Sequence, residues 1–198
     1  MSLLRVFIAI EIPLKIKKAI AAEIANLHNG AGRAVRWVAN ENIHLTLKFL
    51  GEISPASVEL LSQALQAECE QSTPFDITVS GLGCFPNSHR PRIIWIGLNI
   101  PPELNRLQHK LETATTRMGY ATEDKLFSPH LTIGRIREQA TPAELNNIHS
   151  ALEKLHIGSL GTFTTQAVHL FKSDLKPGGP VYTSLFSARL GNFEKDKI

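Results

Sequence analysis

Apolar residues recur along the chain with two different periods, which predict alternating strands and helices. Residues 3–11 are rich in strand-forming residues, and residues 14–28 carry apolar side chains at helical spacing until Asn29-Gly30. A second strand covers residues 43–50 and stops at Gly51. The remaining strands are expected at 75–83, 92–98, 130–136, 161–171 and 181–190, and the remaining helices at 54–70, 101–118 and 141–155.

One short motif occurs twice. Residues 42–47 and 128–133 share the order His-Leu-Thr-aliphatic, and their histidines, His44 and His130, are 86 residues apart. Each copy is followed by a glycine and then by a predicted helix. One His-x-Thr is a weak signal, but two copies in matching places indicate an internal duplication. Strands interleaved with helices also suit a parallel α/β sheet, whereas the duplication favours two similar α+β lobes.

Strand geometry gives the motif a chemical meaning. Side chains at i and i+2 leave a strand on one face, so His44 emerges with Thr46 and His130 with Thr132. The alternate positions of the first copy, through Phe49, are expected to enter the core. If the lobes face each other, two imidazoles and two hydroxyls converge on one small volume. That set suits phosphate chemistry, because histidine exchanges protons near neutral pH and threonine can hold phosphate oxygens.

With these motifs and their flanks, the chain resembles the 2H phosphoesterase superfamily. More narrowly, it resembles the RNA 2′,3′-cyclic phosphodiesterase family, historically called 2′-5′ RNA ligase. The similarity covers nearly the whole chain and rests on the following segments: residues 5–10, 36–38, 41–51, 85–87, 91–95 and 127–135.

The resemblance implies a single bilobal domain over residues 1–198, with two mostly antiparallel sheets facing a central cleft and helices on the outside. It implies hydrolysis of RNA 2′,3′-cyclic ends to 2′-phosphomonoesters without a metal or nucleotide cofactor. It also implies 2′-5′ RNA ligation in vitro as the reverse reaction. His44 then corresponds to the proton donor and His130 to the proton acceptor. Both motifs are intact in this sequence.

Several neighbouring side chains have two interpretations each. Arg135 resembles the substrate-contacting arginine of the family, yet simple alternation turns it away from the motif histidine unless a bulge at Gly134 re-aims it. Lys48 shares the face of His44 by alternation and could add positive potential there, although a surface lysine is the simpler interpretation. Phe7, on the less apolar face of the first strand, could stack on a nucleobase or pack at the lobe boundary. A basic loop could contact RNA or be solvated: His89, Arg90 and Arg92.

Composition excludes few classes of protein. The formal charge of +3 suits a polyanionic partner such as RNA but is common among other proteins. The two cysteines, Cys69 and Cys84, are typical of a reduced cytosolic protein, so we expect a cytoplasmic location. We also expect the protein to be a monomer. The opening segment lacks the pattern of a signal peptide, and no apolar run is long enough to cross a membrane. Neither a metal-binding histidine motif nor a glycine-rich phosphate loop occurs.

Two alternatives remain open at this stage. The same chemistry could act on a small cyclic nucleotide, such as ADP-ribose cyclic phosphate, which activity on mononucleotides against longer oligonucleotides would distinguish. A module that binds RNA ends without turnover is the other alternative. The complete pair of motifs argues against it, because binding alone has little need for an acid and a base.

Overall fold

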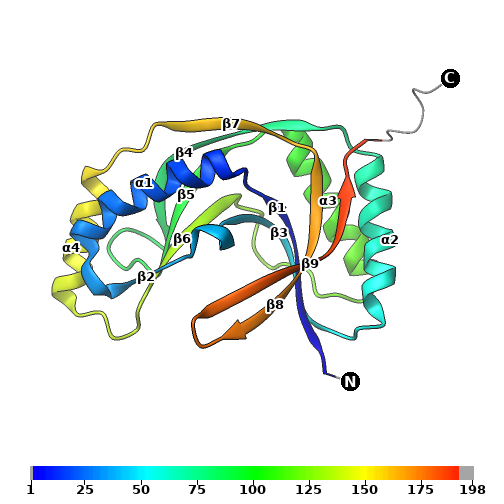
Figure 1. Ribbon diagram of the computed structural model, residues 1–198, viewed down its shortest axis with the longest axis horizontal. Helices are drawn as coiled ribbons and strands as arrows, with labels where there is room; N and C mark the ends of the chain where they lie inside the picture. The colour runs from blue at the N-terminus through cyan, green and yellow to red at the C-terminus, as the bar shows by residue number, and fades with distance from the viewer. Residues whose placement is uncertain (1, 192–198) are drawn as a thin grey trace.

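The computed structural model describes residues 2–191, and Figure 1 shows the path of the chain. The described residues form four α-helices and nine strands. The helices are α1 (Leu14–Ala31), α2 (Ser57–Glu70), α3 (Pro102–Arg117) and α4 (Pro142–Lys154). The strands are β1 (Leu4–Glu11), β2 (Val35–Trp37), β3 (His44–Ile53), β4 (Phe75–Phe85), β5 (Ile93–Asn99), β6 (His130–Ile136), β7 (Ser159–Thr165), β8 (Ala167–Lys176) and β9 (Gly179–Arg189).

All the strands pair in one antiparallel sheet. The order across the sheet is β7-β4-β5-β6-β3-β1-β8-β9, and the short β2 pairs with β6. Every pairing among the described residues is antiparallel. The α+β class is therefore confirmed, and the parallel α/β alternative is wrong.

Two lobes meet at the middle of this sheet. The first lobe consists of β3, β1, β8 and β9, and the second lobe consists of β6, β5, β4, β7 and β2. A single pair of opposite residues, Leu45 and Leu131, joins β3 to β6. The two expected sheets are thus two arms of one continuous sheet, and both histidine motifs lie at the junction.

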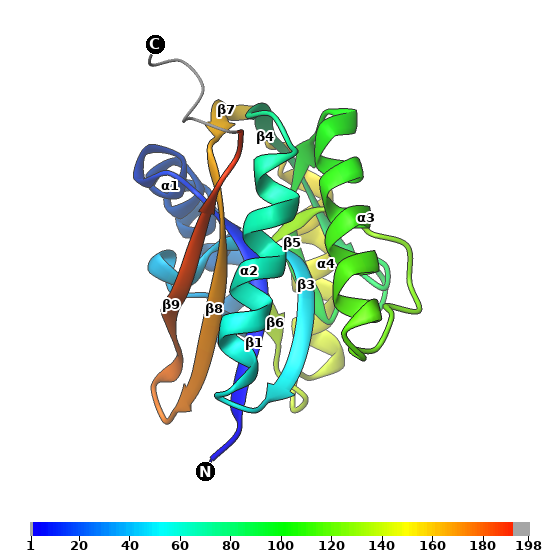
Figure 2. The same cartoon turned by 90° about the vertical axis from the view of Figure 1, so that its right-hand side faces the viewer.

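The helices lie on the outside of the lobes. Helices α2 and α3 pack beside each other over the first lobe, and α1 and α4 do so over the second (Figures 1 and 2). In α1 the helical spacing turns Ile16, Ile20 and Leu27 inward, where they are buried. These side chains join the apolar faces of the strands in one large core. The motif side chains lie on the opposite face of the sheet.

Each lobe takes elements from both halves of the chain. The first lobe combines the N-terminal β1 and β3 with the C-terminal β8 and β9. The predicted strand at 161–171 is in fact two strands, separated at Gln166, of which β7 joins the second lobe and β8 the first. Local hydrophobic patterning identified the β segment, but it carries no information about which sheet edge each part joins.

Within residues 2–191, no helix combines the length and the apolar character needed to cross a membrane. The same residues contain no group of three or more His, Cys, Asp or Glu side chains arranged to hold a metal ion.

Candidate active site

The two motifs meet at the β3–β6 junction. Leu45 and Leu131 stand directly opposite each other, and both are fully buried on the core face. Residues on either side of them point to the other face, which we call the site face. An antiparallel register that pairs these leucines sets each motif histidine opposite the threonine of the other motif. The half-buried side chains gathered there are His44, Thr46, His130 and Thr132.

Both histidines are held by the same hydrogen bond. Nδ1 of His44 lies 2.7 Å from the carbonyl oxygen of Asn42, and Nδ1 of His130 lies 2.7 Å from that of Ser128. A carbonyl oxygen can only accept, so Nδ1 donates and carries the proton in each ring. This fixes the tautomer and leaves both Nε2 atoms available for chemistry.

A bulge after the second motif turns Arg135 toward the site face. Consecutive residues of β5 pair with Thr132 and Gly134, so Ile133 is an extra residue in β6. The extra residue shifts the alternation by one, and Arg135 joins the face of Thr132 and His130, where it is exposed. The bulge required for this placement lies one residue before the expected position.

The first motif contains the same bulge, which sequence reasoning missed. Consecutive residues of β1 pair with Thr46 and Lys48, so Leu47 is extra. Lys48 is consequently buried, with 1% exposure, and its ammonium lies 2.7 Å from the carboxylate of Glu112. Phe49 is 57% exposed on the site face. The expectations of a surface Lys48 and a core Phe49 were therefore wrong.

The electrostatic environment favours a neutral His44 in the free protein. Burial is the main cause that lowers its pKa below the usual value, and the positive charges of Lys17 and Arg135 act in the same direction. The hydrogen bond to the Asn42 carbonyl opposes them. The charge of Arg135 thus reaches the first motif although the residue belongs to the second.

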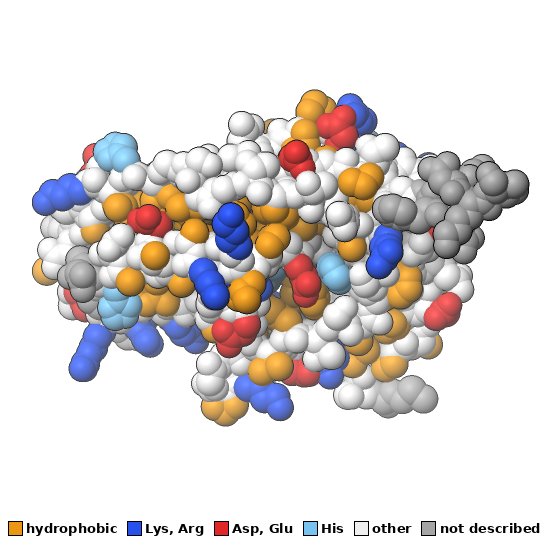
Figure 3. Space-filling model, turned by 45° about the horizontal axis from the view of Figure 1, so that its top comes forward, with side chains coloured by type: hydrophobic (Ala, Val, Ile, Leu, Met, Phe, Trp, Pro, Cys, Tyr) orange, Lys and Arg blue, Asp and Glu red, His pale blue; other side chains and the backbone are white. Residues whose placement is uncertain are grey.

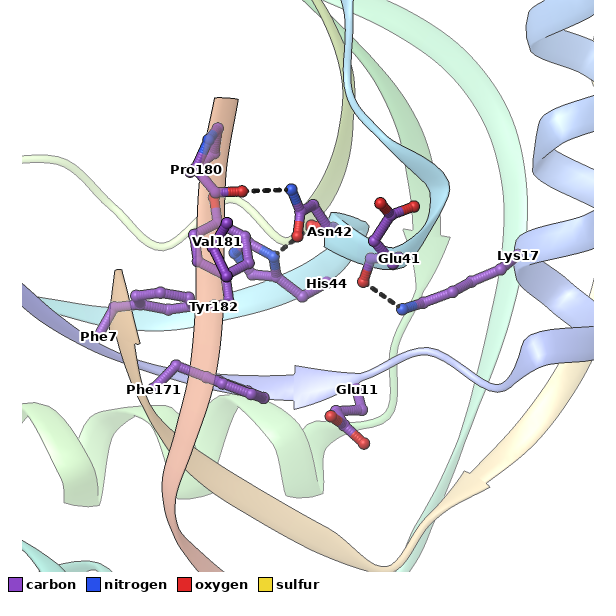
Figure 4. Close-up of a pocket in the computed structure, with 10 residues that line it drawn as sticks. All are labelled: Phe7, Glu11, Lys17, Glu41, Asn42, His44, Phe171, Pro180, Val181 and Tyr182. Carbon is purple, nitrogen blue, oxygen red and sulfur yellow. Dashed lines mark hydrogen bonds between the residues drawn. The ribbon is translucent and has the colours of Figure 1, made fainter. Parts of the chain in front are cut away.

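A pocket of about 230 Å³ opens beside His44 (Figure 4). Its aromatic part comes from β1, β8 and β9, and its polar part from α1 and the segment before β3. Two hydrogen bonds brace the polar part: Asn42 donates to the Pro180 carbonyl at 2.8 Å, and Lys17 donates to the Glu41 carbonyl at 2.7 Å. The lining residues are Phe7, Glu11, Lys17, Glu41, Asn42, His44, Phe171, Pro180, Val181 and Tyr182.

Aromatic rings support each histidine. Phe7 is only 3% exposed, and its ring centroid lies 4.8 Å from that of His44, 5.4 Å from that of Phe171 and 5.0 Å from that of Tyr182. Its ring is largely covered, so the contact with His44 is its visible role, and contact with substrate stays a prediction. Tyr182 also meets His44 edge-on at 5.2 Å.

The second histidine has a corresponding support. Phe85 meets His130 edge-on with centroids 5.0 Å apart, and Trp95 lies 6.4 Å away. Trp95 packs so closely over Gly83 that an added Cβ there would lie 2.3 Å from the indole. The nearby basic loop is exposed at His89, Arg90 and Arg92, and RNA contact by this loop stays a prediction.

Sequence reasoning named Phe7 but missed Phe171, Tyr182 and Lys17, because no motif marks these three residues. Tyr182 and Phe171 come from the C-terminal hairpin, far along the chain from the motif that they support. Lys17 lies on a helix that also carries the exposed Lys15 and Lys18, and nothing in the sequence distinguishes it from these two lysines. The sequence around Tyr182 gives no signal of this role, since the residue stands between Val181 and Thr183 in an ordinary strand pattern.

Comparison with known proteins decides the family. The family described as "LigT like Phosphoesterase" matches residues 10–95 and again residues 97–182, which together make up most of the chain. The chain belongs to this family. The two consecutive matches also agree with the internal duplication, and the resemblance inferred from the motifs is confirmed.

Relatives of this LigT-like phosphoesterase share most of its length. An RNA 2′,3′-cyclic phosphodiesterase of Methanothermobacter thermautotrophicus is 29% identical, over 94% of this chain and 98% of the relative. One of Archaeoglobus fulgidus is 31% identical, over 92% of this chain and 98% of the relative. The chain is thus an enzyme of the same family as proteins that carry this name.

Solved structures agree with the fold. The crystal structure of TT0787 of Thermus thermophilus superposes with a TM-score of 0.80 at 25% identity, covering 95% of this chain and 99% of that one. Escherichia coli LigT complexed with 3′-AMP superposes with a TM-score of 0.75 at 26% identity, covering 96% and 99% respectively.

Proposed function

We propose that this enzyme opens the 2′,3′-cyclic phosphate at the 3′ end of RNA and leaves a 2′-phosphate. The observation that carries the proposal is the pair of His-x-Thr motifs at the β3–β6 junction, where each histidine has no hydrogen bond to Nε2 within residues 2–191. The names of the relatives support the same substrate. A 2′,3′-cyclic phosphate requires a 2′-oxygen, so RNA is selected over DNA by chemistry alone.

The two histidines would act as base and acid in one displacement. Nε2 of His130 takes a proton from water, whose oxygen forms the new bond to phosphorus. The bond from phosphorus to the 3′-oxygen breaks, and Nε2 of His44 donates its proton to that oxygen. The hydroxyls of Thr46 and Thr132 donate to the non-bridging oxygens, and Arg135 offsets the charge that develops on the phosphate.

The lowered pKa of His44 fits this scheme once substrate is included. An acid must be protonated at the start of the step, and the cations around His44 disfavour that state in the free enzyme. A bound phosphate anion has the opposite effect, because negative charge beside an imidazole raises its pKa. Substrate binding would therefore charge the acid when it is needed.

The direct test is the reaction itself. Purified enzyme with EDTA should open an oligonucleotide that ends in a 2′,3′-cyclic phosphate, and chromatography against both standards should identify the 2′-phosphate. No reaction, or a reaction abolished by EDTA, would contradict the proposal. A 3′-phosphate product would refute the orientation of the ribose, although not the two-histidine step.

Three finer properties belong to the same proposal. A 5′-hydroxyl that takes the place of water in the same ring opening would join two RNA ends through a 2′-5′ bond in vitro. His130 would take the proton of this hydroxyl, its oxygen would bond to phosphorus, and the released 3′-oxygen would receive the proton of His44. We also expect the enzyme to act as a monomer, which light scattering would check. The third expectation is a cytoplasmic location, because a chain with only two cysteines, Cys69 and Cys84, suits a reducing compartment.

A further inference from the structure

An unusual pair of like charges lies next to the motif residues. Strand β2 runs along the edge of β6 on the side where β3 has diverged, and Arg36 stands directly opposite Arg135. Both side chains are exposed. Like charges directly opposite each other in a sheet are destabilising. Neither arginine forms an ion pair with a carboxylate within residues 2–191.

The packing of β2 fixes which way Arg36 points. Val35 and Trp37 both close over Gly134 on the core face, where an added Cβ would lie 2.7 Å from Cγ1 of Val35 and 3.1 Å from the Trp37 ring. Since alternate residues leave a strand on opposite faces, Arg36 leaves β2 on the site face. It therefore shares this face with Arg135.

More positive charge surrounds this pair. Arg137 follows β6, and its Nε donates to the carbonyl oxygen of Arg33 at 2.9 Å. Both of these arginines are exposed, and neither forms an ion pair in the described part of the chain. Figure 3 shows Lys and Arg side chains along the lower left margin of the molecule, the end at which Figure 1 places β2 and α4.

The distance from the catalytic groups suits one nucleotide. Arg135 follows Thr132 by three residues, one of them the bulge, so the two lie roughly 10 Å or less apart along the strand. An arginine side chain spans much of that distance. In RNA with a 3′-terminal cyclic phosphate, the next phosphate is the one on the 5′-oxygen of the same nucleotide.

We propose that Arg36, beside Arg135, binds the 5′-phosphate of the terminal nucleotide, so that the enzyme prefers substrates that carry this group. A 5′-phosphate bound by the Arg36 guanidinium through charge-assisted hydrogen bonds would offset its repulsion from Arg135, which stays beside the cyclic phosphate. The inference rests on the proposed function, since it takes the cyclic phosphate to lie at the two motifs. It names the substrate as a 5′-phosphorylated or longer RNA end rather than a bare cyclic nucleoside phosphate.

Three substrates test the subsite: adenosine 2′,3′-cyclic phosphate, the same compound with a 5′-phosphate, and a dinucleotide with a 2′,3′-cyclic end. The wild-type kcat/KM should be roughly tenfold or more higher for the two substrates with a 5′-phosphate, given the usual strength of hydrogen bonds to charged groups. Arg36→Gln should reduce this preference roughly tenfold, and Arg36→Lys by less. Arg117→Gln, which removes an exposed charge at the end of α3, should keep the wild-type preference.

The possible outcomes separate the two proposals. If the bare cyclic nucleoside phosphate is opened but wild type shows no preference, or if Arg36→Gln keeps the full preference, the subsite is refuted and the activity stands. If none of the three substrates is opened, both proposals fail. Thermal melting supplies a second readout: Arg36→Gln should melt no lower than wild type, because the substitution relieves repulsion. A clearly lower melting temperature would overturn the assignment of unpaired like charges.

Discussion

At the scale of single residues, the site depends on how each imidazole is oriented and charged. The Nδ1–carbonyl bond is the same in both motifs, so orientation does not distinguish acid from base. The surroundings of His44 do contribute a difference, because burial and the neighbouring charges of Lys17 and Arg135 lower its pKa. Charges that contact neither ring can therefore change the pKa of His44, and with it how readily this histidine donates a proton.

Lys17 offers a test of this balance. Lys17→Met removes a positive charge, so the pKa of His44 should rise, as a titration of its ring protons by NMR would show. If His44 is the acid, the bell-shaped profile of kcat/KM should keep its form while its alkaline limb moves to higher pH. Lys18→Met, an exposed neighbour on the same helix, is the matched control. An unchanged His44 titration, or a limb that moves to lower pH, would contradict the electrostatic account.

The sequence identified the motif residues at this scale and misplaced some of their neighbours. Each motif histidine shares a face with the threonine two residues later, because a bulge further along the strand does not alter this spacing. The residues concerned are His44, Thr46, His130 and Thr132. Lys48 and Phe49 were misassigned since alternation was extended across a bulge. A bulge depends on pairing with another strand, and a single strand's sequence does not reveal it.

At the scale of elements, the two bulges are a shared device of the duplicated halves. Leu47 in β3 and Ile133 in β6 occupy the same place in the two motifs. Each bulge returns the third residue after the threonine to the site face, which brings out Phe49 in one lobe and Arg135 in the other. The duplicated backbone thus presents an aromatic surface on one side of the histidines and a cation on the other.

The bulge in β3 also creates a buried ion pair with a measurable role in stability. Lys48 donates to the carboxylate of Glu112 on α3 and to the carbonyl of Ala121, in the segment that leads toward the second motif. Lys48→Met should lower the free energy of unfolding by about 3 kcal/mol, because it leaves a largely buried carboxylate unpaired. Urea unfolding would measure the loss.

Two variants control the Lys48 experiment. Lys48→Met combined with Glu112→Gln should recover part of the stability, since no charge is then left without a partner. Lys125→Met, at an exposed position, should change it by less than about 0.5 kcal/mol. If Lys48→Met lowered the free energy of unfolding as little as Lys125→Met, the ion pair between β3 and α3 would not contribute to stability.

At the scale of the whole molecule, the sequence predicted the inventory of elements better than their assembly. The predicted bounds of the strand at 130–136 agree with β6, and those of the four helices lie close to the observed ones. Capping explains part of this success: Thr141 and Glu144 form the reciprocal bonds that start α4. The exchange of elements between lobes was not predictable, because strand partners far apart in sequence leave no local pattern.

The meeting of the lobes at one leucine pair places the two motif histidines at the same junction of the sheet. The central claim is therefore that His44 and His130 serve a single proton-transfer event, and a double-mutant cycle on kcat tests it most directly. His44→Ala and His130→Ala should each lower kcat by roughly 10²–10⁴-fold, and the double variant should lose far less than the product of the two. His156→Ala, at an exposed position away from the junction, should keep the wild-type rate. Losses that multiply cleanly, or a single variant with near wild-type turnover, would contradict the account.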